Sequence, residues 1–178
     1  MDDPPVPLDR FDRRILDELA AEGRLPVTEL ARRVGVSKSP VQARLKRLEA
    51  AGVIRGYRAL IDPIRLGRDH VAFVEVKLSD TREAALGAFN DGVRQVAEVE
   101  ECHMIAGAFD YLLKVRTRDM TSYRRVLAER ISILPHVSST STYVAMQAVK
   151  EAGVVELRGP RARGRAGPRG PRAAQIVI

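Results

Sequence analysis

The chain has 178 residues, of which 45% are hydrophobic and 30% are charged, and this composition excludes wholesale disorder. No apolar run approaches the roughly 20 residues of a membrane-spanning helix, and the acidic, proline-rich start predicts no secretory signal. A single cysteine, Cys102, excludes an intramolecular disulfide framework and a cysteine-cluster metal site. We therefore expect a globular, cytoplasmic protein.

The net charge of +7 is unevenly distributed along the chain. Residues 24–58 hold nine Lys or Arg against two Asp or Glu, and residues 158–178 hold six against none. The segments 1–23 and 59–157 are both slightly acidic. Concentrated positive charge is the electrostatic footprint of a polyanion partner, although a solvated face with a basic tail has the same count.

Three short helical patterns open the chain. The first covers residues 9–22, with apolar side chains at the spacing of a core-facing helix. The second ends at Gly35, and the third is capped by Ser37 or Ser39 and runs to Gly52. A glycine accepts the tight turn between the second and third helices.

An alternating segment, residues 53–61, follows the third helix like a strand or wing, and Pro63 breaks it. Three helices, a turn of about four residues and a small strand pair make a winged helix-turn-helix. We assign residues 1–61 to this domain and residues 62–69 to a linker.

Strands and helices alternate in the second half of the chain. We predict strands at 70–78, 99–106, 111–116 and 137–149, and helices at 81–95 and 119–133. This βαββαβ order predicts a ferredoxin-like domain over residues 70–152, so the fold class is α+β. The bare second face of its sheet predicts a dimer that stacks sheets, and the Gly/Pro/Arg-rich residues 153–178 are expected to be a disordered basic tail.

The third helix carries the sharpest local signal. With Val41, Leu45 and Leu48 buried, its basic face is free to enter a major groove, where Gln42 pairs with adenine and Lys38 reaches guanine. An amphipathic surface helix is the plain alternative, but the turn spacing and the wing favour double-stranded DNA. The candidate base-reading and phosphate-binding residues are Ser37, Lys38, Ser39, Gln42, Arg44, Lys46, Arg47, Arg55 and Arg58.

A turn at residues 107–110 (Gly-Ala-Phe-Asp) joins two predicted strands. Asp110 can hold an ammonium group, and exposed backbone N–H groups can hold a carboxylate, which is the minimum chemistry for an α-amino acid. The same residues also make an ordinary hairpin turn in which Asp110 caps its own backbone, and chemistry alone favours that turn.

Catalytic and metal-binding signals are lacking in the sequence. His70, His103 and His136 lie on separate elements without metal-ligand spacing, and Cys102 falls in a predicted strand as a small buried residue. No Ser-His-Asp series, P-loop or dinucleotide fingerprint is present. We therefore expect no catalytic residue, no metal and no cofactor.

Four segments together resemble the Lrp/AsnC (feast/famine) family of transcription regulators, and most closely its leucine-responsive branch. They are LDRFDRRILDELAAEGR, ELARRVGVSKSPVQARLKRLEAAGVIRGYRALIDP, ECHMIAGAFDYLLKVRTRDMTSYRRVL and STSTYVAM, and the resemblance covers residues 8–152. The resemblance implies homodimers that assemble into octamers or similar rings, promoter DNA wrapped around them, and an amino acid effector held between dimers. It places the effector near Met104, Ile105, Gly107, Asp110, Tyr111, Met120, Thr142, Tyr143 and Val144.

The chain departs from this family at two positions and in its arginine-rich tail. Ala108 stands where leucine-responsive members carry an acidic residue, and His136 stands where a glycine is common. The resemblance predicts a sequence-specific DNA-binding regulator that responds to an amino acid. Two alternatives remain open: an effector-independent architectural protein that wraps DNA, and an enzyme like the haem-biosynthesis decarboxylases that resemble this family. The basic third helix and the lack of a histidine pair argue against the enzyme.

Overall fold

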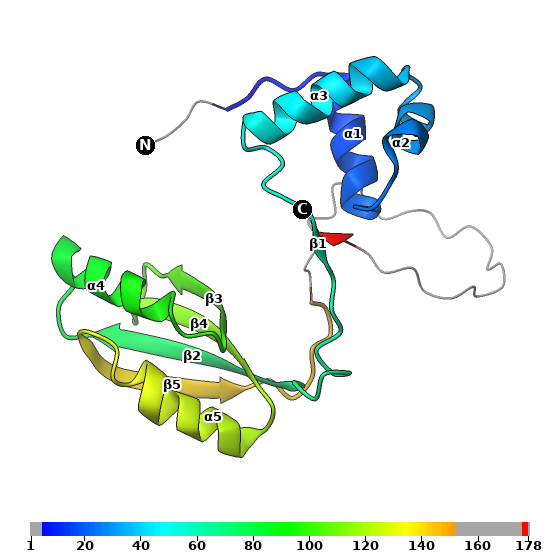
Figure 1. Ribbon diagram of the computed structural model, residues 1–178. Coiled ribbons are helices and arrows are strands. Elements are labelled where there is room, and N and C mark those ends of the chain that lie inside the picture. The colour runs from blue at the N-terminus through cyan, green and yellow to red at the C-terminus, as the bar shows by residue number, and fades with distance from the viewer. Residues whose placement is uncertain (1–4, 152–175, 178) are drawn as a thin grey trace. The chain divides into compact units, whose positions relative to one another are not determined.

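The computed structural model describes residues 5–151 and 176–177 (Figure 1). Asp62–Val149 forms one compact unit, and the helices that precede it form another. None of the helices in the described part of the chain is long and apolar enough to cross a membrane.

Three helices build the first unit: α1 (Arg10–Ala21), α2 (Val27–Val34) and α3 (Lys38–Ala50). The Asp9 carboxylate accepts the backbone N–H of Asp12, and the Asp12 carboxylate accepts that of Asp9, so α1 begins with a capping box. The apolar stripes of the three helices meet in one core of fully buried side chains, which includes Ile15, Leu30 and Leu48. The predicted helix-turn-helix is confirmed.

Gly35 ends α2 with a φ of +77°, in the left-handed region that a glycine adopts without steric cost. Ser37 does occupy the N-cap position of α3, but its side chain makes no capping hydrogen bond, and Ser39 lies inside the helix. Of the two serines predicted as caps, Ser37 therefore holds the N-cap position, but its side chain does not cap the helix.

The wing differs from the prediction. Instead of a strand over residues 53–61, only β1 (Arg58–Ala59) is extended, and it pairs antiparallel with β6 (Ile176–Val177). The backbone N–H groups of Val53 and Ile54 both donate to the carbonyl of Leu48, so the first residues of the alternating segment close α3 and cannot join a ladder. Apart from β6, the predicted tail at residues 153–178 lies outside the described residues.

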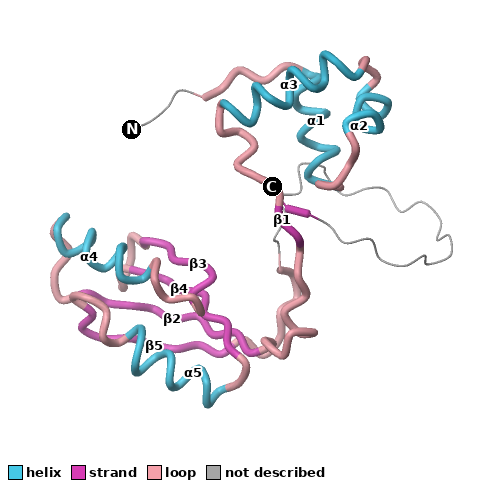
Figure 2. Tube along the Cα trace, in the orientation of Figure 1, coloured by secondary structure: helices cyan, strands magenta, loops and turns pink. Residues whose placement is uncertain are grey.

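The second unit has four strands: β2 (His70–Leu78), β3 (Val99–Met104), β4 (Tyr111–Thr117) and β5 (Val137–Val144). They form one antiparallel sheet in the order β3-β4-β2-β5, shown in magenta in Figure 2. Two helical segments complete the unit: α4 (Glu83–Val93), and α5 (Met120–Val126) with its π-helical continuation η1 (Leu127–Ile131). The predicted βαββαβ ferredoxin-like fold is confirmed.

Both helices of the second unit cover the same face of its sheet. Alternate residues of β2, such as Val74 and Val76, are fully buried in one cluster with Phe89 of α4 and Tyr123 of α5. The residues between them point to the other face, where Phe73 is 38% exposed. One sheet face therefore carries the core and the other is left without a helix.

The last strand is shorter than predicted. Residues 137–149 were expected to be extended, but β5 ends at Val144. Ala72 of β2 pairs with Val144, and the N–H of Ala145 donates to Val71 near the start of β2. Because β2 begins only one residue earlier, the chain beyond Ala145 has no neighbouring strand with which to pair.

Candidate DNA-binding surface and effector site

The outer face of α3 is polar and open to solvent. Val41, Leu45 and Leu48 are buried in the core of the first unit, as the sequence predicts. The side chains between them are exposed at the start and along one side of the helix: Ser37, Lys38, Ser39, Gln42, Ala43 and Lys46. The dimensions of a helix fit the major groove of DNA, so this face is suited to base contacts.

Four of the predicted DNA-binding cations carry uncompensated charge. Lys38 and Lys46 on α3, and Arg55 and Arg58 after it, are exposed and form no ion pair with any other described residue. An ammonium or guanidinium group without a carboxylate partner retains its full attraction for a phosphate. Among the predicted DNA-binding cations, these four are therefore the ones whose charge remains available to an anion.

Arg44 and Arg47 lie in a different environment. Arg44 Nη1 lies 2.6 Å from Asp9 Oδ2 and 2.8 Å from Asp12 Oδ1, and Arg47 Nη2 donates to Asp12 Oδ2. Asp12 is only 1% exposed. No pattern in the sequence indicated that this carboxylate would bind two arginines more than 30 residues away. These contacts tie α3 to the start of α1.

The ion pairs determine the charge state of Asp12. Burial by itself raises the pKa of this carboxyl group, but hydrogen bonds from Arg47, from the backbone N–H of Asp9 and from Arg44 outweigh burial and lower the pKa to about 2. Asp12 is therefore ionised at neutral pH. Its charge offsets part of the positive charge of Arg44 and Arg47, which reduces what these two arginines can offer a phosphate.

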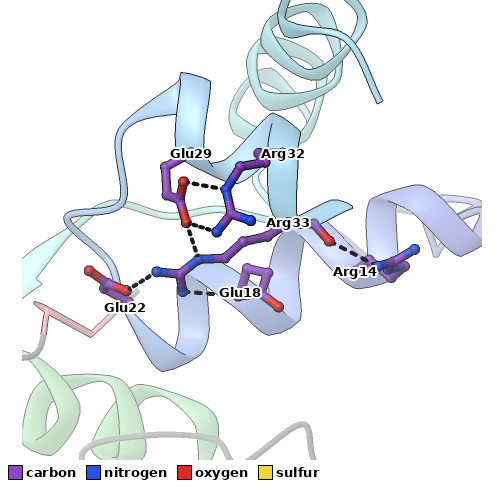
Figure 3. Close-up of polar contacts among 6 residues, drawn as sticks. All are labelled: Arg14, Glu18, Glu22, Glu29, Arg32 and Arg33. Atoms are coloured by element: carbon purple, nitrogen blue, oxygen red, sulfur yellow. Dashed lines mark hydrogen bonds and ion pairs between the residues drawn. The ribbon is translucent and has the colours of Figure 1, made fainter. Parts of the chain in front are cut away.

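Arg33 joins α2 to α1 through a network of carboxylates (Figure 3). Its guanidinium group lies 3.2 Å from Glu18, 2.9 Å from Glu22 and 2.9 Å from Glu29. Arg32 also pairs with Glu29 at 2.6 Å. The positive charge of α2 is therefore largely neutralised, whereas Lys38 and Lys46 of α3 keep theirs.

The Gly-Ala-Phe-Asp turn lies between β3 and β4 in the second unit, as predicted. Asp110 Oδ2 accepts the backbone N–H of Leu78 at 2.7 Å, and the Asp110 N–H donates to the Val76 carbonyl at 3.0 Å. Asp110 thus fastens the turn to the end of β2 rather than capping its own backbone. One carboxylate oxygen, Oδ2, is used in this structural contact.

The structure brings together only part of the predicted effector set. Met104 and Ile105 lie beside Asp110 at one end of β4, whereas Met120 follows the other end of that strand. Seven residues of extended chain span roughly 20 Å, so Met120 cannot share a pocket with the turn within one subunit. Gly107 belongs to the turn itself, and its exposed backbone is open to a ligand.

The β5 residues of the predicted effector set are divided between the two faces of the sheet. Thr142 Oγ1 lies 2.6 Å from Tyr123 Oη on the helix-covered face. Tyr143 pairs with Phe73 on the opposite face and is 55% exposed. Val144 lies at the end of the strand and is also exposed. Tyr111, in contrast, is buried against Phe89 and belongs to the core.

The histidines have no common site. His70 Nδ1 lies 2.9 Å from Thr117 Oγ1, while His103 Nε2 lies 3.4 Å from Glu101. His136 adopts a φ of +63° and is the one non-glycine residue with a positive φ in the described part of the chain. No group of three or more His, Cys, Asp or Glu side chains there could hold a metal ion.

Comparison with known families assigns both units. Residues 8–55 match the family of winged helix-turn-helix DNA-binding domains, and residues 71–155 match the Lrp/AsnC ligand-binding domain.

Individual proteins show the same similarity over nearly their whole length. The chain is 63% identical over 147 residues to a proline dehydrogenase transcriptional activator of Rhizobium radiobacter, which covers 83% of this chain and 94% of the relative. It is 44% identical over 155 residues to the leucine-responsive regulatory protein of Escherichia coli K12, covering 87% and 94% of the two chains.

A solved structure has the same fold. The crystal structure of a Neisseria meningitidis transcriptional regulator in complex with L-Met matches with a TM-score of 0.78 and 32% identity, over 84% of this chain and 96% of that one. Both domains are therefore present in their expected order, with the basic face of α3 exposed as such a regulator requires. The chain belongs to the Lrp/AsnC family of transcriptional regulators, with an N-terminal winged helix-turn-helix DNA-binding domain and a C-terminal amino-acid-binding domain.

Proposed function

We propose that this regulator activates transcription of a proline dehydrogenase gene and that L-proline is its effector. The observation that supports this target is the 63% identity to a proline dehydrogenase transcriptional activator, compared with 44% to a leucine-responsive regulator. A promoter DNA partner would also require the protein to work in the cytoplasm, where a bacterial chromosome lies.

We assign DNA contacts according to the charge that the structure leaves free. Gln42 and Lys38, together with the hydroxyls of Ser37 and Ser39, read base edges from the start of α3. Lys46, with Arg55 and Arg58 from the segment after α3, binds phosphates. Arg44 acts mainly by holding α3 against α1, and Arg47 does so in part, since its Nη2 donates to Asp12 and its Nη1 donates to the Pro7 carbonyl at 3.5 Å.

We propose that the effector site is completed by a second copy of the chain. The predicted effector residues lie on both faces and at both ends of one sheet, so a single subunit cannot close them around an amino acid. Asp110 Oδ1 would hold the ligand ammonium group, with the Gly107 backbone beside it. An effector that binds between copies favours one assembly over another and so changes the spacing of the recognition helices on DNA.

A gel-shift titration at fixed salt tests this function. The probes are the upstream regions of the chain's own gene and of a proline dehydrogenase gene, each with and without proline, leucine and methionine. We expect specific binding whose affinity or band pattern changes with proline. Binding that is indifferent to every amino acid would instead support the architectural alternative, in which the protein wraps DNA without an effector.

The enzyme alternative is weaker, because the relatives named by these comparisons are transcriptional regulators. A decarboxylase acting on a porphyrin needs a ligand-sized pocket with suitably placed histidines. His70, His103 and His136 lie on separate elements of the second unit and have different partners. A porphyrin titration should therefore produce no change in absorbance.

A further inference from the structure

A pocket in the second unit lies at the end of the sheet where β2 begins and β4 ends. Four arginines line it: Arg68 from before β2, Arg116 from β4, Arg118 from the loop after β4, and Arg125 from α5. The turn with Asp110 precedes the opposite end of β4, so this pocket is separate from that turn, while Met120 of the predicted effector set lies in the chain between the lining residues Arg118 and Ser122. The family resemblance assigns no role to any of these arginines.

One of the four arginines forms the rigid floor of the pocket. Arg116 is 7% exposed; its Nε lies 2.6 Å from Glu100 Oε1, and its Nη1 donates to the Arg68 carbonyl at 3.2 Å. This side chain joins β4 to the loop before β2. Because β4 is part of the sheet that carries the core, this side of the pocket is held in place.

The other three arginines carry charge that no described side chain pairs. Arg68, Arg118 and Arg125 are exposed and make no side-chain hydrogen bond or ion pair within the described ranges. The carboxylate next to Arg118, Asp119, uses Oδ1 to cap α5 through the Ser122 N–H at 2.7 Å. Such a concentration of guanidinium groups around a hollow is electrostatically unfavourable unless an anion joins it.

Glu98 lines the same pocket, and its carboxylate needs a hydrogen-bond donor from any ligand that binds there. Its Oε2 is buried and has no hydrogen-bond partner among the described residues. A buried carboxylate oxygen without a donor is costly, so a ligand that supplies an N–H or O–H there gains affinity. Against Glu98, the Glu100 that pairs with Arg116 and the Asp119 beside Arg118, the four arginines leave the pocket with a net positive charge.

We propose that this pocket binds a small phosphomonoester that also carries a hydroxyl or amino donor. The dianionic phosphate group matches the excess charge and the bidentate geometry of Arg68, Arg118 and Arg125. The donor of the ligand pairs with Glu98, which disfavours inorganic phosphate alone because that anion would approach a carboxylate. The regulator thus takes a second ligand, different in class from an amino acid.

Isothermal titration of the full chain with glycerol 3-phosphate tests the proposal, with inorganic phosphate, glycerol and proline as comparison ligands. We expect glycerol 3-phosphate to bind more tightly than inorganic phosphate, and glycerol not to bind. The double variant R118Q/R125Q should lose about tenfold or more in affinity, since it removes two charge-assisted contacts. Glu98→Gln should reduce the preference for glycerol 3-phosphate over inorganic phosphate.

A matched control separates this pocket from the DNA-binding surface. The variant K38Q/K46Q removes two cations from α3 in the other unit and should leave glycerol 3-phosphate binding unchanged. If R118Q/R125Q fails to fold by circular dichroism, Arg118→Lys keeps the charge without the bidentate geometry and should give a smaller but measurable loss.

Three results would overturn the proposal. They are no binding by the wild-type chain at millimolar ligand, equal binding by R118Q/R125Q, and loss of binding in K38Q/K46Q but not in R118Q/R125Q. A fall in DNA affinity alone in R118Q/R125Q would assign these arginines to wrapped DNA instead. The response of promoter binding to proline is measured separately, so failure here and failure of the proposed function are distinguishable.

Discussion

Asp12 has two structural roles in the first unit, as a cap of α1 and as an ion-pair partner for α3. Its carboxylate caps α1 and also accepts hydrogen bonds from Arg44 and Arg47 of α3, although it is 1% exposed. Loss of this carboxylate would leave the half-exposed Arg47 without its ion-pair partner and Arg44 with Asp9 alone, and would also remove the cap of α1.

Asp12→Asn should therefore destabilise the first unit by about 2 kcal/mol. Amide hydrogen exchange in α1 and α3 of the full chain measures this loss. Asp17→Asn makes the same chemical change on α1 at a site with no ion pair among the described residues, and should have little effect. Equal protection of α1 in the wild-type chain and the Asp12 variant would contradict this role.

The low pKa of Asp12 predicts a pH dependence with a definite sign. The folded-state pKa of about 2 lies below the usual value of 3.8, so the ion pairs contribute stability that is fully present above about pH 4. That contribution, about 2 kcal/mol, is lost as the pH falls from 4 towards 2. Urea unfolding at several pH values should show this loss in the wild-type chain and a smaller one in Asp12→Asn.

His136 adopts a backbone conformation that suits glycine, which explains why its family position commonly holds that residue. A non-glycine residue with φ near +63° loses roughly 1 kcal/mol to contact between its Cβ and the backbone. His136→Gly should raise the stability of the second unit by about that amount, less the added entropy of the unfolded chain. His136→Ala, which keeps a Cβ, is the matched control for thermal unfolding. A lower melting temperature for the glycine variant would contradict the strain.

At the scale of the element, α3 combines two functions on opposite faces. Its apolar stripe and Arg44 hold it in place, while its exposed residues face solvent with charge that the rest of the unit does not neutralise. On α2, in contrast, ion pairs already neutralise the charges of Arg32 and Arg33. Two adjacent basic helices thus differ in what they can offer DNA.

Gln42→Ala should change base preference with little change in salt dependence, because a bidentate contact discriminates between bases. Lys46→Ala should weaken binding to all sequences and lower the slope of log K against log salt by about one. Arg32→Ala, on α2, should change neither quantity. Fluorescence anisotropy with a specific and a scrambled site, at several salt concentrations, separates these outcomes. Equal loss of specificity in the Gln42 and Lys46 variants would invalidate the assignment.

At the scale of the whole molecule, the sheet of the second unit has one face with no helix on it. Phe73 and Tyr143 are cross-strand neighbours there, 38% and 55% exposed. An exposed aromatic pair on an otherwise polar surface is typical of a contact between subunits. A second sheet stacked on this face would bury both rings.

Phe73→Glu should therefore lower the assembly state of the full chain in sedimentation velocity, because a carboxylate would be buried in that contact. Lys77→Glu changes a charge on the same strand and face and should have a smaller effect. Because the effector residues of one subunit are divided between faces, Phe73→Glu should also reduce the response of DNA binding to proline. An unchanged sedimentation coefficient would show that the copies meet elsewhere.

The periodicity of the sequence determined most of the fold. Apolar spacing located all three helices of the first unit and the βαββαβ order of the second, because burial of a stripe or of alternate residues is a local property of the chain. The predicted strand at residues 70–78 has the same bounds in the structure. The exposed polar face of α3 followed from the same pattern, since the residues outside a buried stripe must face solvent.

Only the tertiary structure decided which charged residues are paired and where strands end. Arg44 and Asp12 are 32 residues apart, and no periodic pattern relates them. The wing shortened because two of its N–H groups close α3, and β5 stopped where β2 has no more residues to pair with it. The arginine pocket likewise joins β4 and α5 with the loop segments that hold Arg68 and Arg118. Such contacts depend on how distant segments pack, so a sequence supplies the groups but not their partners.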